Sequence, residues 1–139
     1  MKASLGIAIP LVAAMVAGCA GLGSEAEWGS LTGHAIYPRA NRIPPGSVLR
    51  ARLLDVSRQD ARAELIAETM IPLEGREPPV TFSLAYRREA VRSSHHYAVR
   101  ATIDAGERTV YATTESYPVL TRDAPGELEV HLQIVGAPP

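Results

Sequence analysis

Residues 80–86 read VTFSLAY, and an apolar side chain stands at every second position from Val80 to Tyr86. Residues 97–103, YAVRATI, repeat the same alternation. Successive side chains of a β-strand point to opposite faces, so one face of each segment is expected to pack against a core. These two segments are the clearest predicted strands of the chain.

Four more segments have strand-like composition, namely residues 31–37, 48–56, 109–114 and 128–134. The stretch Asp104-Ala105-Gly106-Glu107 has the turn residues of a hairpin that leads into residues 109–114. About seven short strands separated by turn residues are typical of a small β-sandwich. We therefore predict an all-β domain over residues 30–136, a β-sandwich of immunoglobulin-like or transthyretin-like form.

Residues 60–71 are ambiguous. Their alanine, glutamate and leucine content favours a helix. The same residues also alternate as an edge strand would, with Ala63, Leu65, Ala67 and Thr69 on one face. From the residues alone, helix and strand stay equally open for this segment.

The N-terminus has the layout of a secretory signal peptide. Lys2 precedes an apolar run from Leu5 to Val16, which is too short for a transmembrane helix of about 20 residues. The run ends in Val16-Ala17-Gly18-Cys19, which resembles the lipobox of bacterial lipoproteins. Residues 1–18 are thus predicted to form a helical signal peptide that is cut between Gly18 and Cys19.

On this interpretation Cys19 becomes a lipidated first residue, and residues 19–29 form a flexible tether. Two alternatives remain open: a signal peptide that is not lipidated, and a buried helix with a core cysteine. The residue after Cys19 is Ala20 and not an aspartate, and this resembles the pattern of lipoproteins that are sorted to the outer membrane. We expect the protein to be anchored there by its lipid and to face the periplasm.

Composition excludes several functions. The chain has 139 residues, a formal net charge of −1 and one cysteine. The balanced charge gives no basis for nucleic-acid binding, which needs a clustered basic surface. One cysteine cannot form an internal disulfide, and the chain has no zinc or calcium motif. We predict no metal and no cofactor.

Arg87, Arg88 and Arg92 precede His95-His96 in a predicted loop. These arginines are candidates for contacts with anionic lipid headgroups or with an acidic partner. The alternative is a solvated hairpin loop. Tyr111 shares a predicted strand face with Thr109 and Thr113, so it is expected to be exposed and is a further candidate for partner binding near a sheet edge.

Catalytic candidates are weak. Ser57 lies near Asp55 and Asp60, but no Gly-x-Ser-x-Gly elbow surrounds the serine. Side chains that bond to their own backbone at a strand end explain this group better. Glu64 and Glu68 are expected on a solvent-facing edge or helix face. We predict that the protein is not an enzyme.

Five segments in order resemble the YbaY/YscW lipoprotein family, which includes pilotins of type III secretion. They are IPPGSVL at 43–49, LDVS at 54–57 with Asp60-Ala61 after it, PVTFSLAY at 79–86, YAVRATI at 97–103 and YPVLT at 117–121. The resemblance covers roughly residues 31–135. It implies a small β-sandwich, which favours a strand over residues 60–71, and an outer-membrane lipoprotein.

Better understood members of this family act as chaperones that escort a secretin ring to the membrane. The resemblance therefore implies a lipid-anchored binding module or chaperone, pilotin-like, for a secretin or another envelope protein. The alternative is an envelope-organising or glycan-binding lipoprotein with no role in secretion.

Overall fold

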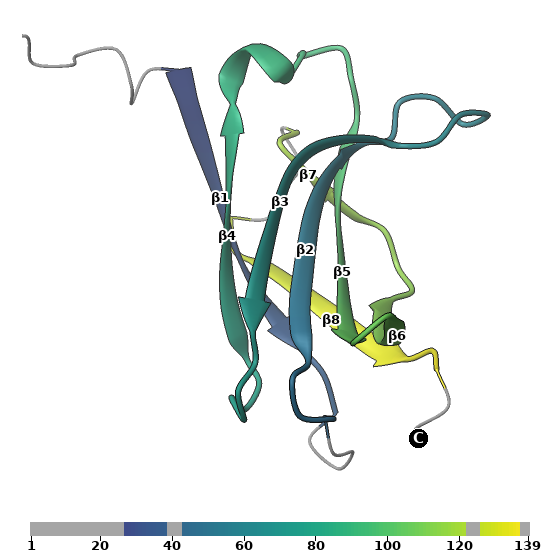
Figure 1. Cartoon of the computed structure of the whole chain (residues 1–139). Coiled ribbons are helices and arrows are strands. Elements are labelled where there is room, and N and C mark those ends of the chain that lie inside the picture. The colour runs from purple at the N-terminus through teal and green to yellow at the C-terminus, as the bar shows by residue number, and fades with distance from the viewer. Residues whose placement is uncertain (1–26, 39–42, 122–125, 137–139) are drawn as a thin grey trace, which may run out of the picture.

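The computed structural model describes residues 27–38, 43–121 and 126–136, and these form eight β-strands and a short 3-10 helix, Arg88–Ala90 (Figure 1). The predicted signal peptide, Gly18 and Cys19 lie outside the described residues. The strands are β1 (Trp28–Ile36), β2 (Val48–Asp55), β3 (Glu64–Pro72), β4 (Val80–Arg87), β5 (Tyr97–Ala105), β6 (Arg108–Thr113), β7 (Tyr117–Val119) and β8 (Leu128–Ile134).

The strands form one nearly closed, barrel-like sheet in the order β3-β2-β5-β6-β8-β1-β4, with β7 paired to β5. The all-β prediction is confirmed, and eight strands are close to the predicted number of about seven. The strands form a nearly closed barrel-like sheet, where an immunoglobulin-like or transthyretin-like sandwich was predicted. The first half of β8 pairs with β1 in parallel, and its second half pairs with β6. Because β8 crosses obliquely from one group of strands to the other, it joins them into one sheet (Figure 1).

The additional strand is β7, which contains Pro118. Proline cannot donate a backbone hydrogen bond, so the sequence around it predicts a loop. In the structure Pro118 lies opposite Ala98 of β5, to which β7 pairs outside the main strand order. Such a position tolerates proline because only one side of the strand needs backbone partners.

Most of the ambiguous segment at residues 60–71 forms strand β3, which begins at Glu64 and lies at one end of the strand order. The helix alternative for residues 60–71 is therefore wrong. β3 pairs with β2 in antiparallel fashion. Leu53 pairs with Ala67 and Leu54 pairs with Leu65, so the register of the two strands shifts between these pairs. Ala67 is buried, whereas Leu65 is 52% exposed.

The predicted alternation of β4 is confirmed, since every second side chain from Val80 to Tyr86 is buried. On the neighbouring strand β1, Gly33 lies opposite Phe82 and Gly29 lies opposite Tyr86. A Cβ atom at Gly33 would lie 2.5 Å from Cζ of Phe82, so the ring occupies the space that a side chain would fill. The other large side chains that are almost fully buried include Leu49, Leu53, Leu73, Leu84, Tyr97, Val99, Ile103, Val130 and Leu132.

Candidate functional site

Two loops meet at the end of the barrel where β1 begins. Residues 56–63 connect β2 to β3, and residues 88–96 connect β4 to β5 (Figure 1). The backbone amide of Val56 donates to the carbonyl oxygen of His96 at 2.8 Å, which joins the two loops at their bases. Trp28 pairs with Arg87 in the β1–β4 ladder and therefore marks the same end. We call it the N-terminal end of the barrel.

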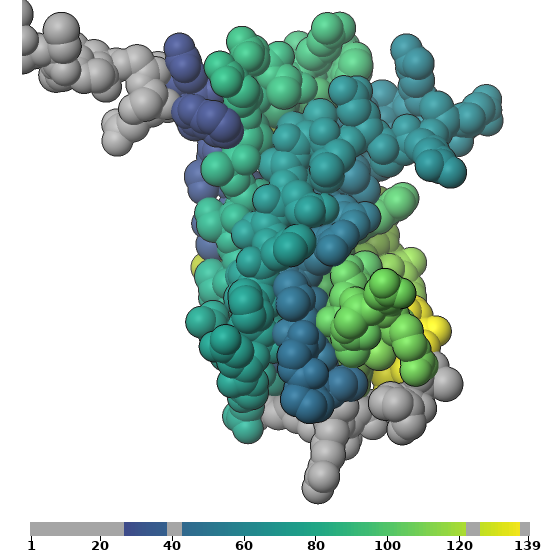
Figure 2. Space-filling view, viewed as in Figure 1, coloured from purple at the N-terminus to yellow at the C-terminus, as the bar shows by residue number. Residues whose placement is uncertain are grey.

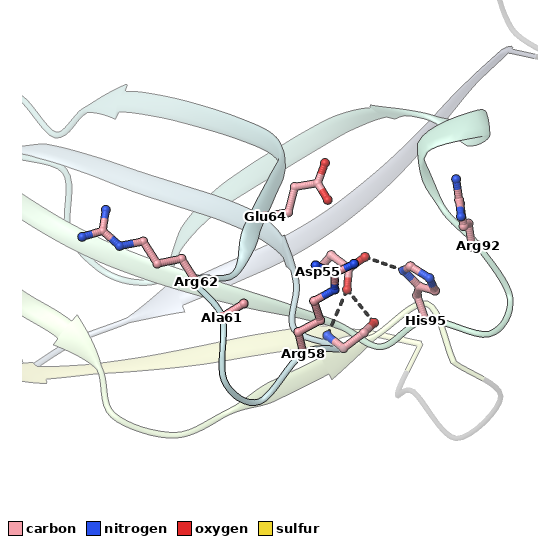
Figure 3. A pocket seen from close by; sticks show the side chains of 8 residues that line it. Asp55, Arg58, Ala61, Arg62, Glu64, Arg92 and His95 are labelled. Carbon is pink, nitrogen blue, oxygen red and sulfur yellow. Dashed lines mark hydrogen bonds and ion pairs between the residues drawn. The ribbon is translucent and has the colours of Figure 1, made fainter.

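Asp55, the last residue of β2, is the centre of a hydrogen-bond network between these loops (Figure 3). The amide and the hydroxyl of Ser57 donate to Oδ1 of Asp55 at 2.9 and 2.5 Å. His95 Nδ1 lies 2.6 Å from Oδ2, and the amide of His96 donates to the hydroxyl oxygen of Ser57 at 2.9 Å. Both carboxylate oxygens of Asp55 are thus occupied, and the loop of residues 56–63 is held at its base.

The same contacts lower the pKa of the Asp55 carboxyl from 3.8 to about 2. The hydrogen bond from the Ser57 side chain is the largest cause, and His95 and the Ser57 amide act in the same direction. Partial loss of solvent around the carboxylate opposes them. Asp55 is therefore ionised throughout the physiological pH range.

Ser57, Asp55 and His95 do not form a hydrolytic triad. In a triad the serine hydroxyl bonds to the imidazole that removes its proton. Here the carboxylate lies between the two groups, because Ser57 and His95 bond to different oxygens of Asp55. The interpretation as a strand-end residue that bonds to the local backbone is confirmed for Asp55, whereas the Ser57 hydroxyl bonds to the Asp55 side chain and to the amide of His96. Asp60 lies exposed in the same loop.

Replacing Asp55 with asparagine is expected to lower the free energy of unfolding by about 1–2 kcal/mol at pH 7, because charge-assisted hydrogen bonds are lost in a partly screened setting. The pKa of the Asp55 carboxyl is lower in the folded protein than in the unfolded chain. Its negative charge therefore stabilises the fold above about pH 4, and this stabilisation is lost as the pH falls towards 2. The difference between wild type and Asp55→Asn should therefore shrink from pH 5 to pH 2 in urea denaturation.

Asp60→Asn is the matched control, since Asp60 is an exposed acid of the same loop. We expect it to change the free energy of unfolding by less than about 0.5 kcal/mol at any of these pH values. An Asp55→Asn effect that does not depend on pH would contradict the account of the network.

Two hollows flank the loop of residues 56–63, and Arg58, Ala61 and Arg62 line both of them. The first has a volume of about 400 Å³ and lies next to the Asp55 network, with Arg92 and Glu64 also in its wall (Figure 3). The second, of about 520 Å³, lies over β2 and β5. We call these the network hollow and the arginine hollow.

The arginine hollow takes its name from Arg52, Arg58, Arg62 and Arg100 in its wall. Among the described residues, no aspartate or glutamate lines it. Figure 2 shows the loop of residues 56–63 projecting from the body of the molecule, with a recess beside it. Residue type and spacing do not point to this cluster, because Arg52 and Arg100 lie 48 positions apart and only the pairing of β2 with β5 brings them together.

Of the predicted partner-binding arginines, Arg92 alone lines one of these hollows. Arg87 pairs with Glu89 at 3.1 Å and lies 5.4 Å from the centre of the Trp28 ring. Arg88 donates through Nε to the carbonyl oxygen of Trp28 at 2.9 Å. These two side chains hold the start of β1, whereas Arg92 stays exposed in the loop.

The expected exposure of Tyr111 is wrong, because its side chain is only 3% exposed. The β5–β6 ladder shifts register beside Ile103 and Asp104, which pair with Tyr111 and Thr109, so Val110 is an extra residue in β6. Such a β-bulge interrupts the alternation of faces. Both Val110 and Tyr111 are therefore buried, and the ring of Tyr111 packs 6.1 Å from that of Tyr37.

Glu68 pairs with Arg52 across the β2–β3 ladder at 2.8 Å, and Glu64 lines the network hollow. Both glutamates are exposed on the edge strand, as predicted. Within residues 27–38, 43–121 and 126–136, no three His, Cys, Asp or Glu side chains are grouped so that they could hold a metal ion. The described part of the chain also has no helix that is long and apolar enough to span a bilayer.

The described residues thus form a small, nearly closed β-barrel with a hydrogen-bonded pair of polar loops at one end. Residues 26–132 match the family model described as type III secretion system lipoprotein chaperone (YscW). The chain belongs to this YscW family of lipoprotein chaperones.

Two relatives extend this assignment. The chain is 28% identical over 80 residues to the lipoprotein YbaY of Escherichia coli (strain K12), described as uncharacterized, and the match covers 58% of this chain and 42% of that protein. The structure is similar to an alternative pilotin from the type II secretion system of Vibrio cholerae, with a TM-score of 0.74 and 30% identity. That similarity covers 80% of this chain and 100% of the pilotin chain.

Proposed function

We propose that this protein is a pilotin-like chaperone, anchored to the outer membrane by lipid at Cys19 and facing the periplasm. It binds a secretin or another envelope protein and keeps that partner at the membrane. The observation that carries the proposal is the similarity to the Vibrio cholerae pilotin, which extends over the whole of that chain. The family match to a lipoprotein chaperone supports it independently.

The two comparisons name different secretion systems, type II for the similar structure and type III for the family. What they have in common is a protein that serves a secretion apparatus. The proposed function is therefore defined by this shared role.

Anchoring explains how a domain of this size can direct a larger partner. Trp28 lies nine positions after Cys19, and a fully extended chain over nine residue steps spans about 30 Å. The N-terminal end of the barrel would thus stay within about 30 Å of the membrane surface. A partner bound to the barrel shares this confinement, which raises its effective concentration at the membrane.

The proposal is tested by crosslinking the full lipoprotein in cells, solubilising it in detergent and identifying captured proteins by mass spectrometry. We expect an envelope protein to be enriched over a strain with the untagged lipoprotein, and a secretin where the cell expresses one. Failure to recover a secretin from such a cell would reject the pilotin role. Recovery of peptidoglycan fragments or of other lipoproteins instead would support the envelope-organising alternative.

A further inference from the structure

We propose that the arginine hollow binds an acidic peptide segment of the partner protein, an inference that rests on the proposed chaperone function. The hollow is formed by Arg52 of β2, Arg100 of β5 and the loop arginines Arg58 and Arg62. Three of these residues lie in β2 and the loop that follows it, and the pairing of β2 with β5 brings Arg100 beside them.

The first observation is a pair of like charges. Arg52 and Arg100 lie directly opposite each other in the β2–β5 ladder. Like charges at directly opposed positions destabilise a sheet, so this pairing does not help the domain to fold. Glu68 offsets the charge of Arg52, and a bound anion beside Arg100 would offset the charge that remains.

The second observation concerns the partners of these arginines within the described residues. Arg52 is paired with Glu68 at 2.8 Å, whereas the guanidinium groups of Arg58, Arg62 and Arg100 make no ion pair there. Arginine presents several N–H donors in a planar group that matches a carboxylate in bidentate fashion. Three such groups around one hollow are therefore available for an anionic ligand.

The third observation is the apolar part of the wall. Leu54, Val56 and Ala63 line the hollow between the arginines, and Leu54 is only 8% exposed although it lies on the outer face of the sheet. A hollow of about 520 Å³ with this lining has room for several side chains. Its chemistry suits a peptide segment in which acidic residues alternate with or adjoin apolar ones.

The position of the hollow favours a peptide over the headgroups of a membrane. Arg52 and Arg100 lie three residues inside the ends of β2 and β5, on the side of the barrel. A flat bilayer against the N-terminal end of the barrel would meet the loop tips before these strand residues. A peptide can enter the side hollow without this restriction.

The base of the loop is fixed by the Asp55 network, with both oxygens of Asp55 occupied. This network holds the start of the segment that carries Arg58 and Arg62. The loop arginines are thus attached to a defined base, which reduces the conformational entropy that binding would have to overcome.

The test is fluorescence anisotropy with the full chain in neutral detergent and a short fluorescein-labelled peptide of glutamate, leucine and serine. A second peptide carries glutamine in place of every glutamate. We expect the acidic peptide to bind more tightly than the glutamine peptide, and its affinity to fall as the ionic strength rises from about 0.05 M to about 0.5 M. Equal binding of the two peptides would overturn the proposal.

Arg100→Gln is expected to weaken binding of the acidic peptide about tenfold, as for loss of one charge-assisted contact. Arg76→Gln is the matched control, because Arg76 is exposed in the loop between β3 and β4 at the other end of the barrel. We expect it to change the affinity less than about twofold. Equal losses in the two variants would mean attraction by overall charge and would overturn the assigned site.

A thermal melt of Arg100→Gln separates binding from folding. Because the substitution removes one of two opposed like charges, we expect Tm at low ionic strength to be unchanged or higher. A large fall in Tm would show that Arg100 serves the fold and would overturn the proposal.

Mixed micelles that contain phosphatidylglycerol or phosphatidylcholine distinguish a lipid headgroup from a peptide. We expect that neither kind of micelle displaces the acidic peptide from the site that contains Arg100. If phosphatidylglycerol micelles displaced the acidic peptide from the wild-type chain but not from Arg100→Gln, the arginine hollow would be assigned to lipid headgroups instead. Crosslinked capture of an envelope partner that is unchanged in Arg100→Gln would reject this site and leave the proposed function standing.

Discussion

Replacing Cys19 with serine is expected to abolish metabolic labelling of the protein with palmitate and to leave the unprocessed precursor. The lipobox-like sequence Val16-Ala17-Gly18-Cys19 places a thiol after small residues, and attachment of a lipid through a thioether needs that thiol. Serine keeps the size of the side chain but replaces sulfur with a hydroxyl oxygen. Because this is the sole cysteine of the chain, no other residue can substitute for it.

The measurement combines radioactive palmitate labelling with gel electrophoresis of membrane and soluble fractions. Wild type should be labelled and membrane-bound, since stable anchoring takes two or more acyl chains. Ser24→Ala is the control, because it alters a hydroxyl residue beyond the predicted cleavage site and should leave the label unchanged. A Cys19→Ser protein that still incorporates palmitate would reject lipidation at this residue.

Phe82→Ala is expected to lower the free energy of unfolding by about 3–5 kcal/mol, a large part of the stability of an ordinary domain. Phe82 is 1% exposed and lies opposite Gly33, with its ring in the space where a Cβ atom of residue 33 would stand. Alanine at position 82 would leave a cavity over a residue that has no side chain to fill it. Tm should fall by roughly 10–25 °C.

Urea denaturation of the full chain in detergent measures this loss. The control is Ser83→Ala at the next position of β4, which points to solvent and bonds to Ser30 at 3.1 Å. We expect it to cost less than about 1 kcal/mol. Similar losses for the two variants would contradict the assignment of Phe82 to the core and the strand register with β1.

The strands could be predicted where alternation is undisturbed, as in residues 80–86, 97–103 and 128–134. The segment at 60–71 could not be decided by its residues, because its helix-favouring composition competes with its alternation. In the structure this segment pairs with β2 as a strand, with Ala67 opposite Leu53. Backbone hydrogen bonds to a neighbouring strand override the weak preference for a helix.

Two features depend on contacts that a linear pattern does not contain. The burial of Tyr111 results from the extra residue Val110, and a bulge of this kind leaves no clear trace in the alternation of side chains. The closure of the barrel results from β8, which changes its partner from β1 to β6 halfway along. Sequence spacing predicts β8 as a strand but says nothing about its neighbours.

The candidate site was predicted only in part. The loop of residues 88–96 and the turn-forming role of Asp55 and Ser57 follow from residue type, whereas their connection through His95 depends on strand pairing. The arginine hollow is a product of register, since Arg52 and Arg100 become neighbours only when β2 pairs with β5.

The central claim is that lipid at Cys19 places a bound partner at the outer membrane. It is tested most directly by separating inner and outer membranes from cells with the wild-type chain or Cys19→Ser, and by measuring the captured envelope partner in each fraction. The account predicts that the partner lies in the outer-membrane fraction with wild type and is depleted there severalfold or more with Cys19→Ser. An unchanged distribution of the partner between the two membranes would contradict it.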